Sequence, residues 1–189
     1  RAVRLPAGGT GIVGTGAAAT LSPSSALTNG SGLATFASFT LTGATGDRQL
    51  RFTATALPGS PTVLSSVVTV SAGPGNQLTL TQQPPTTAVN GAVLSPAVVA
   101  QLRDAALNPV ATSGVTVTAS VASGPGILSG TLTALTNASG TATFANLVIT
   151  GSAVPHTLLF AAAGYLSIQS NTINLTAGAG TQLTYSVQP

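Results

Sequence analysis

Apolar and hydroxyl-bearing residues alternate with a period of two along much of the chain. The clearest examples are residues 68–70, 115–121, 173–175 and 183–187, where Thr, Ser or Asn stands between apolar residues. Successive side chains of a strand point to opposite faces, so this pattern predicts strands with one buried and one hydrated face. Pro and Gly turn signals separate these segments, for example at residues 84–85, 90–91, 108–109 and 124–126.

One segment, residues 96–107, resembles a helix in length. Its adjacent residues Val98 and Val99 and its Thr- and Gly-rich neighbours favour a strand instead. The whole pattern therefore predicts an all-β fold, without a helix.

Two segments recur in the sequence at nearly the same distance. Residues 177–189 repeat residues 72–84 at an offset of 105, and residues 134–145 repeat residues 26–37 at an offset of 108. A unit of about 105 residues is a whole domain, the size of a seven-strand β-sandwich. We therefore expect an incomplete sandwich over residues 1–71 that lacks its first strands, and a complete one over 72–176. Residues 177–189 would form a lone first strand. It would be either the first strand of a following repeat or a strand that is donated to another subunit.

The second unit resembles a known group of modules. Its residues 96–104, 108–110, 126–130 and 136–144, followed by Gly151 and the strand through Phe160, are similar to tandem bacterial immunoglobulin-like repeats. These repeats build surface adhesins, invasin-like stalks and extracellular fibres. The resemblance also covers most of the first unit from about Gly11, and it implies tandem immunoglobulin-like antiparallel β-sandwiches at an extracellular or cell-surface location.

The composition excludes several classes of function. Charged residues make up 4% of the chain, with 5 Arg, 2 Asp, one His and no Lys, Glu, Cys, Met or Trp, while about a quarter of the residues are Ser or Thr. The net charge of +3 arises because acids are scarce, and the Arg residues lie in three separated groups. Nucleic-acid binding would need a clustered basic surface, so no nucleic acid is expected as a partner.

Catalytic chemistry would have to use His156 with Asp47 or Asp104 and one of the many serines. His156 follows Pro155 in what resembles a hairpin loop, and its counterpart in the first unit is Arg48. We therefore interpret His156 as a solvent-facing turn residue and expect no enzyme. Two Asp and one His are also too few to build a metal site from side chains, so neither a metal nor a cofactor is expected.

Three sequons, at Asn29, Asn137 and Asn174, are candidate glycosylation sites and make glycans candidate partners. Asn29 and Asn137 occupy equivalent turns, where the alternative explanation is that an Asn side chain bonds back to the turn backbone.

The sequence at one end of the chain matches a strand that the unit at the other end lacks. Counterparts of residues 72–108 are missing from the first unit, whereas residues 177–189 repeat a first strand. We expect head-to-tail self-assembly in which an assembly strand, with Leu183, Tyr185 and Val187, fills the open sandwich of the next subunit. The alternative is that the chain is a window of a longer tandem array. No run reaches the 18 or so consecutive apolar residues of a membrane span.

The sequence thus predicts a structural subunit of an extracellular bacterial fibre or surface stalk. The rival hypothesis is an adhesin or glycan-binding module whose ligand meets exposed loops such as residues 43–47 or 151–156. The scarcity of charge favours a surface that neighbouring subunits or glycans cover, because charge otherwise protects sheets against edge-to-edge association.

Overall fold

The computed structural model describes residues 8–13, 19–54, 57–178 and 180. Every regular element among them is a β-strand, as the alternation predicts. The chain divides into two compact units, residues 1–73 with 106–108 and residues 74–105 with 109–189.

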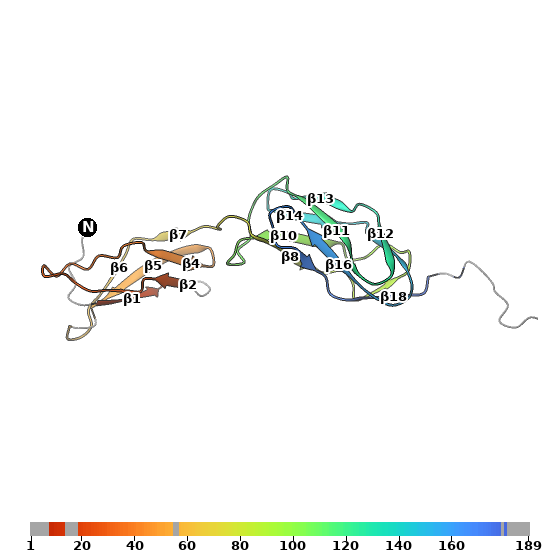
Figure 1. Cartoon of the computed structure of the whole chain (residues 1–189). Helices are drawn as coiled ribbons and strands as arrows, with labels where there is room; N and C mark the ends of the chain where they lie inside the picture. Colours follow the sequence, from red (N-terminus) through yellow and green to blue (C-terminus); the bar gives the residue numbers. More distant parts are fainter. Residues whose placement is uncertain (1–7, 14–18, 55–56, 179, 181–189) are drawn as a thin grey trace, which may run out of the picture. The chain divides into compact units, whose positions relative to one another are not determined.

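One sheet of the second unit contains three antiparallel strands (Figure 1). The central strand β10 (Val98–Arg103) pairs with β8 (Gln77–Gln82) on one side and with β14 (Thr141–Phe144) on the other. The strand predicted within residues 96–107 is therefore confirmed. Val98, Ala100 and Leu102 of β10 are buried, because they alternate onto the face that meets the core.

The other sheet of the second unit is built around β11 (Thr116–Ser123) and β16 (Pro155–Ala161), which pair with each other. Smaller strands extend it: β13 (Thr133–Leu135) pairs with β11, while β17 (Ile168–Gln169) and β18 (Ile173–Thr176) pair with β16. A separate two-stranded sheet consists of β12 (Gly126–Ser129) and β15 (Val148–Gly151).

One pairing differs from the predicted antiparallel arrangement. Strand β9 (Thr87–Val89) lies parallel to β18 at the end of the second sheet. Parallel neighbours require a long crossover connection, and here that connection runs through most of the second unit. An alternating pattern of three residues is the same in either direction, so the sequence does not predict this orientation.

The core of the second unit lies between the sheet of β8, β10 and β14 and the sheet built around β11 and β16. Phe144 of β14 and Phe160 of β16 are 1% and 0% exposed, and their ring centroids are 5.2 Å apart at an interplanar angle of 61°. Leu102, Leu147 and Leu158 of the same unit are also completely buried. Edge-to-face contact between the two rings thus joins one sheet to the other.

The first unit repeats five strand pairings of the second. Its strands are β1 (Gly8–Val13), β2 (Ala19–Ser22), β3 (Ser25–Ala26), β4 (Thr40–Gly43), β5 (Gly46–Thr53), β6 (Thr62–Leu64) and β7 (Val68–Val70). Strand β5 pairs with β1, β6 and β7 as β16 pairs with β11, β17 and β18. The pairs β1–β3 and β2–β4 correspond to β11–β13 and β12–β15.

The aromatic pair of the first unit is less buried than that of the second unit. Phe36 and Phe52, the counterparts of Phe144 and Phe160 at an offset of 108, also form a ring pair, with centroids 5.6 Å apart. Both rings are only half-buried. Among the described residues of this unit, no pair of strands corresponds to β8 and β10, so no described strand covers the aromatic pair as they do.

Candidate functional site

His156 is buried, which corrects the prediction of a solvent-facing turn residue. It lies at the start of β16, opposite Ile173 of β18, and its side chain is 0% exposed. The inward alternation of β16 begins with His156 and continues with Leu158 and Phe160, so the strand starts earlier than the Pro155 turn signal suggests.

Glycines make the space for this imidazole ring. A Cβ atom on Gly124 would lie 2.5 Å from His156 Cδ2, and one on Gly126 would lie 2.8 Å from His156 Nε2. The Nδ1 atom lies 2.7 Å from the carbonyl oxygen of Val154. Nε2 is buried, and within the described part of the chain it has no hydrogen-bond partner. The ring therefore fills a buried space that the two glycines leave open.

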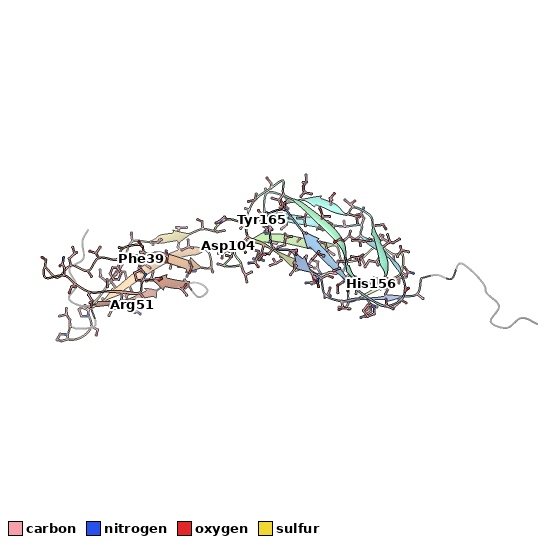
Figure 2. All side chains as sticks on the ribbon, in the orientation of Figure 1. Phe39, Arg51, Asp104, His156 and Tyr165 are labelled. Carbon is pink, nitrogen blue, oxygen red and sulfur yellow. The ribbon has the colours of Figure 1, made fainter. Side chains whose placement is uncertain are left out.

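Among the described residues of the second unit, no carboxylate that a catalytic triad would need is brought to His156. Asp104 is buried after β10, and the two residues lie at opposite ends of the second unit (Figure 2). Asp47 belongs to the first unit, where its Oδ1 accepts a hydrogen bond from the Thr69 hydroxyl at 2.6 Å. Among the described residues, no group of three His, Cys, Asp or Glu could hold a metal ion.

The first unit carries another buried basic side chain at the same position. Arg48 is 3% exposed and pairs with Val68 of β7 in the register that joins His156 to Ile173. Its Nη2 donates to the carbonyl oxygen of Ala44 at 2.6 Å. The side chains of Arg48 and His156 therefore each lie within hydrogen-bond distance of a backbone carbonyl oxygen just before their own strand. The period-two register with Leu50 and Leu158 was the signal that could have predicted this burial from the sequence.

The Asn29 and Asn137 turns have the same structure. In each turn the Asn Oδ1 accepts the backbone N–H groups of the second and fourth following residues, at 3.0 and 3.0 Å for Asn29 and at 2.9 and 3.1 Å for Asn137. A glycine with positive φ, Gly32 at 72° or Gly140 at 74°, closes each turn. The predicted bond from the Asn side chain to the turn backbone is thus confirmed.

The three sequons differ in how they use the amide nitrogen that a glycan would modify. Asn29 and Asn137 are exposed and engage only Oδ1 in the hydrogen bonds described above. Asn174 lies in β18, where its Nδ2 donates to the carbonyl oxygen of Thr86 at 3.3 Å. Glycosylation at Asn29, Asn137 and Asn174 stays a prediction, and this geometry favours the two turns over the strand.

One of the loops named in the rival ligand-binding hypothesis is mostly exposed. In the loop at residues 151–156, residues 152–155 are exposed, while His156 points inward. Tyr165 is half-buried, with its ring packed against the backbone of Gly75, where a Cβ atom would lie 2.6 Å from Cε1.

The predicted assembly residues Leu183, Tyr185 and Val187 lie outside the described residues. Within the described part, no helix is long and apolar enough to cross a membrane.

Comparisons with solved structures give similarity at low sequence identity. A β-glucuronidase from Parabacteroides merdae is 15% identical over 68% of this chain and 16% of that one, with a TM-score of 0.38. The surface layer protein SbsC, domains 1–6, is 14% identical over 72% and 17%, with a TM-score of 0.36. The D0-D1 domain of intimin is 20% identical over 90% and 83%, with a TM-score of 0.34.

The chain spans less than a fifth of the length of the first solved structures that it matches. No curated protein matches it. Among protein families, the model described as SMCHD1 Ig-like domain 6 matches residues 73–179, and the sheets of the second unit lie in this range. This match covers more than half of the 189 residues, and the chain belongs to that family of immunoglobulin-like domains.

Proposed function

We propose that the chain is a structural subunit of an extracellular bacterial fibre or surface stalk, that it assembles head-to-tail by strand donation, and that it performs no catalysis. The immunoglobulin-like family and the shared pairings of the two units support a scaffold role. Fold alone does not assign function, so the proposal rests on one specific surface of the first unit.

That surface is the half-buried aromatic group formed by Phe36, Phe39 and Phe52, which we call the open aromatic face. The ring centroids of Phe36 and Phe39 are 6.3 Å apart, and those of Phe36 and Phe52 are 5.6 Å apart. The corresponding residues of the second unit, Phe144, Leu147 and Phe160, are at most 1% exposed. When a partner covers a half-buried apolar group of this kind, the association is stabilised by about 25 cal/mol per Å² of apolar area removed from water.

The second unit indicates which kind of partner fits. There, β10 and β8 complete the sheet that contains Phe144, and Leu78 of β8 is buried opposite Leu102. Residues 177–189 repeat the sequence around β8 at an offset of 105, which places Leu183 at the position of Leu78. We therefore assign residues 181–189 of a second copy as the donated strand, with Leu183, Tyr185 and Val187 supplying its apolar side chains.

Electron microscopy of the purified chain tests the proposal. We expect linear fibres with a repeat of one or two domains, and we expect deletion of residues 181–189 to abolish them. Leu183→Asp should also prevent assembly because it places a charge on the apolar face of the donated strand. Thr184→Asp is the matched control, since adjacent strand residues point to opposite faces.

Two results would contradict different parts of the proposal. Fibres that persist after deletion of residues 181–189 would exclude strand donation as the mode of assembly. Monodisperse monomers of the complete chain at high concentration would exclude the fibre itself and favour the adhesin or glycan-binding hypothesis.

A further inference from the structure

We propose that Asn29 is a self-modifying site, at which the side-chain amide reacts with the backbone nitrogen of Gly30. The reaction needs only water, and it converts Asn29 to aspartate or isoaspartate. Three asparagines of this chain, Asn29, Asn90 and Asn137, differ in the hydrogen bonds to Oδ1, in the engagement of the following N–H group or in the following residue.

The first feature is the environment of the side-chain oxygen. Asn29 Oδ1 accepts two backbone hydrogen bonds, from the N–H groups of Ser31 and Leu33, each at 3.0 Å. Attack on the side-chain carbonyl carbon moves negative charge onto this oxygen. Donors that already point at an oxygen where charge develops lower the barrier of such a step, because they need no reorganisation. The turn thus serves as an oxyanion hole for its own asparagine.

The second feature is the attacking nitrogen. Gly30 has no side chain, and no atom lies within 4 Å of the position that a Cβ would occupy, so the peptide group is unhindered. In the part of the chain that the structure describes, the Gly30 N–H makes no hydrogen bond. Asn90 and Gly91 form the same dipeptide, but the Gly91 N–H donates to the carbonyl oxygen of Ile149 at 3.0 Å. Attack by Gly91 would first require this bond to break.

The third feature is the residue that follows the asparagine. Asn137 has the same two hydrogen bonds to Oδ1 as Asn29, but Ala138 follows it. A methyl group on the residue that supplies the nitrogen restricts the backbone angles that glycine can adopt. Asn137 therefore combines the two turn hydrogen bonds to Oδ1 with a hindered nucleophile. Asn90 is followed by an unhindered glycine, but the Gly91 N–H is already hydrogen-bonded, and Asn90 Oδ1 accepts from the Gly151 N–H instead of from its own turn.

The reaction at Asn29 balances without a co-reactant other than water. The Gly30 amide loses its proton to water, and its nitrogen bonds to the Asn29 side-chain carbonyl carbon. The Nδ2 group takes up a proton from water as its C–N bond breaks, and it leaves as ammonia. Water then opens the cyclic imide at one carbonyl to give aspartate or at the other to give isoaspartate.

The two products have different consequences for the turn. Either product adds a carboxylate and lowers the formal net charge from +3 to +2. An aspartate retains an oxygen that can accept both N–H groups. An isoaspartate inserts an additional main-chain carbon, so it cannot preserve the bonds to Ser31 and Leu33 together.

Mass spectrometry of the intact folded chain, incubated in mildly alkaline buffer and then digested with trypsin, tests the proposal. Cleavage at the arginines yields the peptide of residues 5–48, in which Asn29 is the only asparagine. We expect Asn29 to convert at least about tenfold faster than Asn90 and Asn137, a difference of about 1.4 kcal/mol in barrier. An enzymatic isoaspartate assay on the same peptide identifies the product.

Reciprocal variants provide the controls. Gly30→Ala gives Asn29 the neighbour of Asn137 and should slow its conversion about tenfold, while Ala138→Gly should accelerate Asn137 by a similar factor. In urea, Asn90 and Asn29 should convert at similar rates, because unfolding releases the Gly91 N–H and removes the different hydrogen bonds to the two Oδ1 atoms. Equal rates at the three asparagines in the folded chain would overturn the proposal, as would a Gly30→Ala variant that converts as fast as the original.

Discussion

The two units share their strand pairings but differ in how far their aromatic pairs are covered. In both, a Phe in the segment after the Asn turn contacts a Phe on the long central strand, at centroid distances of 5.6 and 5.2 Å. The rings are half-buried in the first unit and completely buried in the second, where β8 and β10 complete the sheet. Strand pairing and turn geometry therefore do not depend on the completed sheet, whereas burial of the core does.

Truncation of one aromatic ring in each unit should give the largest difference in stability between the two units. Phe144→Ala removes a side chain that is 1% exposed, and we expect a loss of about 3–5 kcal/mol in the free energy of unfolding of the second unit. The equivalent change Phe36→Ala removes a half-buried ring. It should lower the free energy of unfolding of the first unit by about 1–2 kcal/mol, because the truncated ring buries less apolar area. Urea unfolding followed by hydrogen exchange and mass spectrometry assigns each loss to its unit.

Thr143→Ala is the matched control for Phe144→Ala, since Thr143 is the exposed neighbour on the same strand. It should change stability by less than about 0.5 kcal/mol. Equal losses for Phe36→Ala and Phe144→Ala would show that the open aromatic face is covered in solution, for example by a second copy.

Gly124→Ala should have the next largest effect, because it tests the packing around the buried His156. Gly124 has a φ of 96°, and the added Cβ would lie 2.5 Å from the imidazole Cδ2 and 2.9 Å from the carbonyl oxygen of Pro155. Backbone strain and crowding together should cost the second unit about 2–3 kcal/mol. Thermal unfolding of the variant measures this loss.

Gly114→Ala separates strain from crowding. Gly114 also has a positive φ, 81°, but no atom lies within 4 Å of its Cβ position. This variant should lose only the backbone contribution, about 1–2 kcal/mol. A loss as large as that of Gly124→Ala would mean that the glycine pocket around His156 contributes nothing beyond backbone strain.

The sequence predicts the features that depend on nearby residues. Alternation predicts β11 and β18, and the residues of the Asn137 turn predict its side-chain hydrogen bonds, since donor and acceptor lie within four positions. The burial of His156 depends on Gly124, Gly126 and Ile173, which approach it from separate segments. The period-two register with Leu158 indicated an inward side chain, but the Pro155 turn signal favoured exposure, and no local pattern showed that glycines of another segment leave space for the ring.

The smallest predicted effect concerns the outer face on which the two units differ chemically. Ile127 of β12 lies opposite Thr150 and is 73% exposed, while its counterpart Thr20 of β2 lies opposite Thr42, with the two hydroxyl oxygens 2.5 Å apart. Ile127→Thr therefore gives the second unit the cross-strand pair of the first. It removes almost no buried area and adds a Thr–Thr contact, so stability should change by less than about 0.5 kcal/mol in thermal unfolding. A loss above about 1 kcal/mol would mean that a partner in solution covers Ile127. A neutral result would mean that the outer face accepts an apolar or a hydroxyl side chain equally well. The sequence requirements that the two units share would then concern only their inward-facing residues and their turns.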